Sequence, residues 1–238
     1  MKIALIGYGK MGKAIEEVAL LKGHSIVLKI DQPNLQDFTR ENTMQADVAI
    51  EFTAPHSAYN NIRQCLEWGV PVVSGSTGWT DRLGGIKQFC SSHNGAFIYA
   101  SNFSVGVNIF FEVNKRLAAL MAPHKEYEVI LEETHHTQKK DAPSGTAITL
   151  AEQVLEKIHR KKQWVNALSD NPEDLEVISQ RVDPAPGTHT VKYSSVIDDI
   201  EITHTAHNRK GFASGAVLAA EFLTGKKGCF SMKDVLGL

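Results

Sequence analysis

Residues 2–31 read KIALIGYGKMGKAIEEVALLKGHSIVLKID, and this stretch decides the fold of the N-terminal part of the chain. The apolar run 2–6 leads directly into Gly7, Gly9 and Gly12, which predicts a buried strand followed by a glycine-rich turn. Apolar residues then recur at helical spacing, and a second apolar run follows. This order of strand, glycine turn, helix and strand is typical of a dinucleotide-binding unit.

Each glycine of the turn has its own physical task in such a unit. Gly7 permits the tight turn, Gly9 lets the backbone approach a pyrophosphate, and Gly12 allows helix and strand to pack closely. Asp31 ends the second strand, where a carboxylate can accept hydrogen bonds from ribose hydroxyls. The alternative is a glycine-rich turn in an unrelated α/β unit, but the acid at the end of the second strand favours nucleotide binding.

Asp31 also predicts which nucleotide is preferred. A carboxylate at that position repels the 2′-phosphate of NADPH, so we expect NADH to be used well and to be preferred. Lys10 and Lys29 are nearby cations in the sequence that could soften this repulsion.

Strand and helix signals continue to alternate as far as residue 100. We expect strands at 25–30, 46–53, 71–74 and 96–100, and helices at 57–68 and 80–92. Such alternation implies a parallel sheet, in which ligands bind beyond the carboxyl ends of the strands. Three loops at that edge are cofactor-binding candidates: Phe52-Thr53-Ala54-Pro55, Gly75-Ser76-Thr77-Gly78 and Ala100-Ser101-Asn102-Phe103. For the loop that starts at Gly75, an ordinary turn is the alternative.

The rhythm of the sequence changes after Phe103. We expect helices at 104–121 and 146–159, strands at 127–135, 175–182, 189–197 and 200–206, and a last helix at 211–225. Strands in close succession suggest a mixed or antiparallel sheet. The predicted fold class is α/β, with a Rossmann-type parallel-sheet nucleotide-binding domain and a smaller α+β domain with a mixed sheet. The first domain is expected to comprise 1–104 and 208–238, and the second 105–207.

Residues 132–146 read EETHHTQKKDAPSGT and join a predicted strand to a predicted helix. His135 and His136 are adjacent at the end of the strand, so their side chains point to opposite sides of an extended chain. A metal site needs three or four ligands. His204 and His207 are further candidates, but their spacing matches no HxH or HExxH pattern, so we expect no metal. A structural histidine pair is the alternative to a functional one.

The second half of this segment combines cations with the start of a helix. Ser144 is suited to cap the helix, and the N–H groups of Gly145 and Thr146 would then point toward an anion. Lys139 and Lys140 precede them closely. One interpretation is a carboxylate held by those N–H groups and a lysine ammonium. The other is a solvated lysine pair beside a plain serine cap.

The composition excludes several classes of function. Apolar residues make up 42% and charged residues 22%, as in ordinary globular proteins, and a net charge of −2 gives no support to nucleic-acid binding. Cys65, Cys90 and Cys229 form no CxxC pair or disulfide framework, so a reducing cytoplasm is expected. The N-terminal apolar run is too short for a signal peptide or a membrane span. The sequence has no GxSxG motif of a serine nucleophile. The glycine-rich nucleotide-binding turn and the anion-binding helix start together point to hydride transfer onto a small carboxylate-bearing substrate.

Motifs from end to end of the chain carry a family resemblance. They are Gly7–Gly12, Phe52-Thr53, Gly75-Ser76-Thr77-Gly78, Ala100-Ser101-Asn102-Phe103-Ser104, His135-His136-x-x-Lys139, Asp141–Ala147, Arg209–Val217 and Lys233-Asp234-Val235-Leu236. The combination of HHxxK with DAPSGTA is highly specific. In these motifs the chain resembles the 4-hydroxy-tetrahydrodipicolinate reductases, or dihydrodipicolinate reductases, of the bacterial diaminopimelate and lysine pathway.

The resemblance implies an enzyme that uses NADH or NADPH to reduce a cyclic imine dicarboxylate, 4-hydroxy-tetrahydrodipicolinate, to tetrahydrodipicolinate. It also implies a homotetramer, with subunit contacts made by the sheet of the second domain. It assigns His135 and Lys139 to catalysis, and His136, Lys139, Ser144, Gly145 and Thr146 to substrate binding. It assigns the cofactor to Gly7, Gly9, Lys10, Met11, Gly12, Asp31, Phe52, Thr53, Gly75, Ser76, Thr77, Ala100, Ser101, Asn102 and Phe103.

The chain departs from the family in two places. Thr137 and Gln138 stand where members often carry a basic residue or a histidine, and the region 164–175 is short. Neither departure removes a catalytic position, and the proton donor stays open between His135 and Lys139. The alternative functions are a different nicotinamide enzyme on a similar two-domain plan, and a dinucleotide-sensing regulator, although no helix-turn-helix signal is visible.

Overall fold

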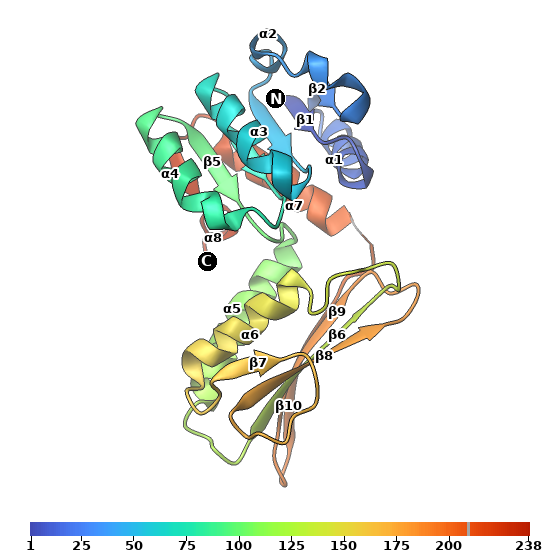
Figure 1. Ribbon diagram of the computed structural model, residues 1–238, viewed down its shortest axis with the longest axis vertical. Helices are drawn as coiled ribbons and strands as arrows, with labels where there is room; N and C mark the ends of the chain where they lie inside the picture. The colour runs from blue at the N-terminus through green and yellow to red at the C-terminus, as the bar shows by residue number, and fades with distance from the viewer. Residues whose placement is uncertain (209) are drawn as a thin grey trace. The chain divides into compact units, whose positions relative to one another are not determined.

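The computed structural model describes residues 1–208 and 210–238, and the chain divides into two compact units (Figure 1). Unit 1 comprises Met1–Val105 and the C-terminal segment that ends at Leu238, and unit 2 comprises Gly106–Asn208. Each unit has its own sheet, with two hydrophobic cores in unit 1 and one in unit 2. Arg209, with which one of the family-like segments begins, lies outside the described residues.

Unit 1 is built on a six-stranded sheet with the strand order β11-β5-β4-β3-β1-β2. Its strands are β1 (Lys2–Ile6), β2 (Ser25–Ile30), β3 (Val48–Glu51), β4 (Val72–Ser74), β5 (Ala96–Tyr99) and β11 (Gly228–Phe230). Neighbouring strands all pair in parallel. The carboxyl ends of the strands therefore meet at one edge of the sheet, where ligands bind in such folds.

Helices cover both faces of this sheet. One core contains α1 (Lys10–Leu21), α7 (Lys210–Leu223) and α8 (Met232–Leu236), and the other contains α3 (Pro55–Glu67) and α4 (Leu83–Ser92). Short elements are the 3-10 helices η1 (Gln32–Asp37) and η2 (Thr80–Arg82) and the helix α2 (Arg40–Thr43). In β1, Ile3 and Leu5 belong to the first core, whereas Ala4 and Ile6 belong to the second. This two-sided burial explains the continuous apolar run of the strand.

Unit 2 has a five-stranded mixed sheet with the strand order β10-β9-β6-β8-β7. Its strands are β6 (Glu128–His135), β7 (Gln163–Val165), β8 (Asp174–Arg181), β9 (Thr188–Ser194) and β10 (Asp199–Thr205). β6 pairs in parallel with β8 and antiparallel with β9. The helices α5 (Val105–Met121) and α6 (Gly145–Lys157) share a core with the sheet, to which β6 contributes Val129 and Leu131. The alternate residues of β6 leave that core, as the two-residue period of a strand requires.

The predicted fold class is confirmed, but several predicted boundaries are wrong. The strand expected at 189–197 ends at Ser194, because the Ser195 hydroxyl accepts the N–H groups of Ile197 and Asp198 and forms a turn. The strands β7 and β11 were not predicted, because each is only three residues long and is defined by its pairing with β8 or with the distant β5. None of the described helices is both long and apolar enough to cross a membrane.

Candidate functional site

The glycine-rich turn between β1 and α1 leaves room for a nucleotide pyrophosphate to approach the backbone. Gly7 has a φ of +99°, and a Cβ there would lie 2.0 Å from the carbonyl oxygen of Phe52. A Cβ on Gly12 would lie 2.3 Å from the carbonyl oxygen of Gly7, whereas nothing lies within 4 Å of a Cβ on Gly9. Close backbone contacts therefore require Gly7 and Gly12, and the N-terminus of α1 is open beside Gly9. These residues fit a bound dinucleotide.

Two further predicted cofactor residues, Lys10 and Met11, form the first turn of α1, with Lys10 exposed and Met11 half-buried. Asp31 follows β2 and is half-buried. Its carboxylate accepts the N–H of Gln32 at 2.9 Å, and its own N–H donates to the side chain of Asn34 at 2.8 Å. This reciprocal cap holds Asp31 at the carboxyl end of the sheet, where a ribose would lie.

A buried glutamate that the sequence analysis did not single out connects two of the candidate cofactor loops. Glu51 ends β3, and its carboxylate accepts hydrogen bonds from the hydroxyls of Ser74 at 2.6 Å and Ser76 at 2.7 Å. It also accepts the N–H of Thr53 at 3.0 Å and the Thr53 hydroxyl. Because a buried carboxylate must be hydrogen-bonded, Glu51 fixes the loops that follow β3 and β4 relative to each other.

Phe52 connects the same loops through packing. A Cβ on Gly75 would lie 2.2 Å from the Phe52 ring, and the rings of Phe52 and Phe103 are 5.9 Å apart between centroids. Of the other predicted cofactor residues, Ser76 is buried, Ala100 and Asn102 are half-buried, and Thr77 and Ser101 are exposed. The structure therefore brings the loops after β1, β3, β4 and β5 together, and the Ser76 hydroxyl supports its loop from inside.

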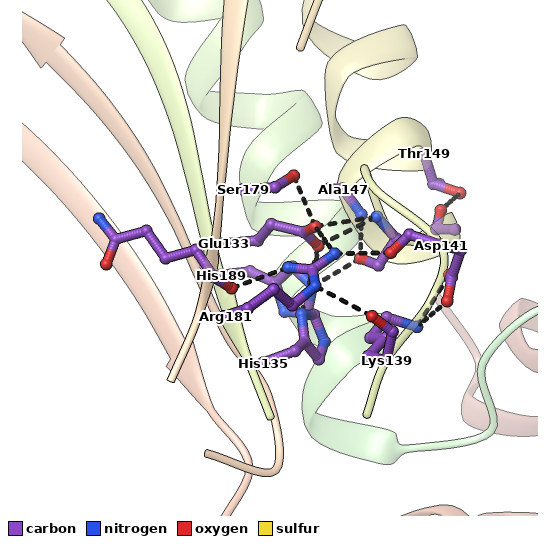
Figure 2. A network of polar contacts seen from close by, with 12 residues as sticks. Glu133, His135, Lys139, Asp141, Ala147, Thr149, Ser179, Arg181 and His189 are labelled. Atoms are coloured by element: carbon purple, nitrogen blue, oxygen red, sulfur yellow. Dashed lines mark hydrogen bonds and ion pairs between the residues drawn. The ribbon is translucent and has the colours of Figure 1, made fainter. Parts of the chain in front are cut away.

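In unit 2, Glu133 is the centre of a polar network (Figure 2). Its side chain is fully buried, and its two oxygens accept the backbone N–H of Ser144 at 3.0 and 3.1 Å. It also accepts the Ser179 hydroxyl at 2.8 Å and the Arg181 guanidinium at 3.2 Å. One carboxylate thus joins β6, β8 and the start of α6.

Arg181 extends this network to the loop that carries the predicted catalytic lysine. Its guanidinium donates to the carbonyl oxygens of Asp141 at 2.6 Å and Lys139 at 3.3 Å. The Lys139 ammonium donates to both carboxylate oxygens of Asp141, at 2.9 and 2.8 Å. Lys140 is exposed. The loop backbone is therefore clamped by Arg181 while the Lys139 ammonium holds a carboxylate.

His135 lies beside the network with its ring largely buried. Its Nδ1 is 3.4 Å from a Glu133 oxygen, and its ring centroid is 5.0 Å from that of His189. Gly187 has a φ of +153°, and a Cβ on it would lie 3.0 Å from Nε2 of His135, so the backbone at Gly187 packs closely against the ring. His136 is half-exposed, and the two adjacent histidines therefore have different surroundings.

The start of α6 divides into a buried side and an open side. The Ser144 hydroxyl accepts the N–H of Ala147 at 3.2 Å and lies 3.1 Å from Nε2 of His189, with only 3% of the residue exposed. Its side chain is therefore engaged in capping the helix. Gly145 is exposed, with nothing within 4 Å of a Cβ on it, and Thr146 is half-buried in the same turn. The open side is where an anion could approach the helix N-terminus.

The charges of the network follow from its burial and hydrogen bonds. Burial alone would raise the pKa of Glu133, but hydrogen bonds from Ser144 and Ser179 bring it below its ordinary value. Burial lowers the pKa of His135 against the opposing attraction of Glu133, and it lowers the pKa of His189 to about 3. At neutral pH the network therefore holds one carboxylate beside two neutral imidazoles.

Glu133, His135 and His189 are residue types that can bind a metal ion, but the charges around them disfavour a metal site. Ligand atoms of Glu133, His135 and His189 lie within 4.8 Å of one another. The Arg181 guanidinium, however, is 3.2 Å from a Glu133 oxygen, so a divalent cation would meet a fixed positive charge. Both Glu133 oxygens already accept the N–H of the buried Ser144, with which an ion would compete. We therefore still expect no metal here.

Sequence reasoning selected the loop and the helix start, but it missed Glu133, Arg181 and His189. Arg181 and His189 lie on strands whose pairing with β6 cannot be read from spacing along the chain. Glu133 did carry a signal, because it occupies an inward position two residues after the buried Leu131. A carboxylate at an inward strand position is buried and needs several hydrogen-bond donors, so such a residue in the sequence predicts a buried polar network.

Two family models match the chain in succession. The model described as dihydrodipicolinate reductase, N-terminus, matches residues 1–103, and the model described as dihydrodipicolinate reductase, C-terminus, matches residues 106–236. A curated 4-hydroxy-tetrahydrodipicolinate reductase from Christiangramia forsetii is 50% identical over 240 residues, covering 99% of this chain and 98% of that protein. One from Ralstonia pickettii is 34% identical over 267 residues and covers 100% of both chains.

Solved structures agree with this at the level of the fold. A dipicolinate-bound dihydrodipicolinate reductase from Paenisporosarcina sp. TG-14 superposes with a TM-score of 0.76 at 22% identity, covering 97% of each chain. An engineered D-amino acid dehydrogenase bound to NADP+ superposes with a TM-score of 0.56 at 13% identity, covering 97% of this chain and 92% of that one. The fold is therefore also shared with a dehydrogenase whose structure was solved with NADP+.

Proposed function

The chain belongs to the dihydrodipicolinate reductase family and is an oxidoreductase of the diaminopimelate route to lysine; we propose that it reduces 4-hydroxy-tetrahydrodipicolinate to tetrahydrodipicolinate through the residues described below. The observation that carries the proposal is the Lys139 ammonium, which binds a carboxylate through two contacts, at 2.9 and 2.8 Å, in the loop before α6. A substrate carboxylate would form a charge-assisted hydrogen bond with such a cation.

Substrate binding is assigned to the open side of this helix start. The Asp141 carboxylate on Lys139 stands in for a substrate carboxylate, which would displace it and gain the N–H groups of the first turn of α6. Gly145 and Thr146 supply that turn, and the half-exposed His136 begins the loop that leads from β6 to it. The contribution of Ser144 is indirect, because its hydroxyl holds the helix start in shape.

The cofactor is assigned to the glycine turn and the neighbouring loops of unit 1. When bound there, a reduced nicotinamide dinucleotide supplies the hydride. Gly9 leaves room for the pyrophosphate at the N-terminus of α1, and Asp31 accepts from the ribose hydroxyls. Because the Asp31 carboxylate would repel a 2′-phosphate, NADH is the preferred nucleotide and NADPH the weaker one.

The proton that completes the reduction comes from Lys139 in this proposal. His135 is largely buried and its pKa is lowered, so it is neutral at neutral pH and a poor acid. The side chain of Lys139 is 23% exposed, so its ammonium is open to a bound substrate. His135 then shapes and shields the position at which the proton is delivered, through its packing against Gly187 and His189.

Assembly and location complete the proposal. A homotetramer in the cytoplasm fits the family resemblance. Val196 and Ile197 at the turn between β9 and β10 are more than four-fifths exposed, at 104% and 83%, which suits burial in a subunit contact. Light scattering coupled to size-exclusion chromatography measures the assembly directly, and a monomeric mass at micromolar concentration would remove this part.

The activity itself is tested by a coupled assay. The upstream synthase condenses pyruvate with aspartate semialdehyde, and the loss of reduced-nicotinamide absorbance is followed after this enzyme is added. We expect oxidation of NADH that depends on both synthase substrates. NADH oxidation with aspartate semialdehyde alone, and none with the condensation product, would instead favour a different nicotinamide enzyme.

A further inference from the structure

Three side chains that have no part in the proposal above form a cluster beside the glycine-rich turn: Tyr8, Glu16 and Lys29. One Glu16 oxygen is 2.6 Å from the Lys29 ammonium, and the other accepts a hydrogen bond from the Tyr8 hydroxyl. The Lys29 ammonium also lies 4.9 Å from the centre of the Tyr8 ring. Both oxygens of Glu16 are thus engaged, and the cation is held by a carboxylate and an aromatic face.

The position of this cluster relates it to the nucleotide ribose. Tyr8 lies within the glycine turn itself, and Lys29 precedes Asp31 by two residues. The backbone at Asp31 is still extended, so the side chains of Lys29 and Asp31 leave the same face of the chain. Ile30, between them, is buried in the opposite core. Lys29 is therefore a cation on the face from which Asp31 would contact the ribose.

We propose that Glu16 is a specificity-determining residue for the nucleotide, because it holds Lys29 in an internal ion pair and so withholds the cation that a 2′-phosphate would need. NADH has only hydroxyl groups on the ribose that Asp31 would contact, so its binding does not need the Lys29 cation. A 2′-phosphate would meet the Asp31 carboxylate with the nearby positive charge already engaged. This role of Glu16 rests on the proposed function in one respect only, namely that the nucleotide binds at the glycine-rich turn.

The contact between Glu16 and Lys29 favours the charged form of both groups. The hydrogen bond to Lys29 lowers the pKa of Glu16, and the hydrogen bond to Glu16 raises the pKa of Lys29. Both groups are therefore charged at neutral pH, and the pairing persists over the range in which the enzyme would be assayed.

The test is Glu16→Gln, which keeps the side-chain size and an acceptor for Tyr8 but removes the charge that holds Lys29. Two quantities are measured for NADH and NADPH: the dissociation constant by isothermal titration calorimetry without substrate, and kcat/KM. We expect the NADPH-to-NADH ratio of both affinity and kcat/KM to rise on the order of fivefold, as for a partly exposed charge pair. The NADH values should stay close to those of the unchanged enzyme.

Neighbouring residues supply matched controls. Glu17→Gln removes the same charge one position along α1, where Glu17 instead pairs with Lys210 at 2.9 Å, and it should leave the ratio unchanged. Lys29→Met alone should also change the ratio little, because Lys29 is already engaged. The same change in the Glu16→Gln background should abolish the gain for NADPH, and this double-mutant cycle isolates the coupling.

Three results would overturn the inference: an unchanged ratio in Glu16→Gln, an equal rise in Glu17→Gln, or a rise that persists without Lys29. Calorimetry separates this inference from the proposed reaction. A shift in the binding ratio without turnover of the condensation product would reject the reaction and support the role of Glu16, whereas normal turnover with an unchanged ratio would do the reverse.

Discussion

The Glu133 carboxylate accepts the backbone N–H of Ser144 through both of its oxygens, at 3.0 and 3.1 Å. Ser144 is the cap of α6, so a buried charge on β6 sets the point at which the helix begins. The position of the exposed first turn of α6, and hence of the proposed substrate carboxylate, depends on this contact.

Glu133→Gln should therefore impair substrate binding from a buried position. The amide keeps the volume but loses the charge that pairs with Arg181, and its NH2 group cannot accept the N–H of Ser144. Leaving a buried partner unpaired costs about 3 kcal/mol, which urea denaturation would measure as a lower free energy of unfolding. We also expect a lower kcat/KM for the substrate with an unchanged KM for NADH.

Glu132→Gln is the matched control, because Glu132 is the exposed neighbour on the other face of β6. It should behave like the unchanged protein in both measurements. Equal losses in the two variants would mean that net charge, and not the contact with Ser144, carries the effect.

The stability of unit 2 should fall in mild acid because of His189. Its pKa is about 3 in the folded chain and 6.5 as the ordinary value, so the unfolded chain binds more protons below pH 6.5. The stabilisation from a neutral His189 is thus complete above pH 6.5 and is lost as the pH falls toward 3, by up to about 1.4 kcal/mol per pH unit for one proton. Burial depresses the pKa of His135 in the same direction.

Thermal unfolding between pH 8 and pH 5 checks this expectation. His189→Gln removes one titrating group, so its melting temperature should fall less steeply with acidification than that of the unchanged protein. His124→Asn, at an exposed histidine, should leave the slope as it is. Parallel slopes for all three proteins would contradict the role given to His189.

The prediction from sequence succeeded where the signal was local. The glycine turn and β1 were recognised because a strand buried on both faces has a continuous apolar run, and the positive φ of Gly7 needs glycine. β11 was missed because its pairing with β5 depends on chain segments far apart. Glu51 was missed for the same reason, since its donors come from other strands and loops, whereas Glu133 was missed although its inward position in β6 carried a signal.

Glu51→Gln should weaken nucleotide binding without affecting substrate binding. The buried carboxylate accepts from Ser74, Ser76 and Thr53, and an amide would oppose one of these donors with a second donor. The cost of one such buried mismatch is about 1–3 kcal/mol. We expect a higher dissociation constant and KM for NADH, with the substrate KM unchanged.

Glu67→Gln, at the exposed end of α3, is the control for the loss of one acid from unit 1. A rise in the substrate KM of Glu51→Gln, with normal nucleotide binding, would show that the loops after β3 and β4 do not act as nucleotide supports.

Lys139→Gln tests the central assignment, because it removes the ammonium that now holds the Asp141 carboxylate and keeps approximate length. A lost charge-assisted hydrogen bond of about 1.5–3 kcal/mol corresponds to a roughly 10- to 100-fold fall in kcat/KM for the substrate. A fall in kcat/KM that comes only from a higher KM would mean that Lys139 only binds the substrate. A lower kcat as well would mean that it also supplies the proton or stabilises the developing charge. Lys140→Gln is the internal control, because Lys140 is exposed beside the same loop, and it should leave the enzyme near normal. If Lys140→Gln proved the more damaging change, the roles assigned from the HHxxK spacing would have to move by one residue, and the assignments of His135 and His136 would move with them.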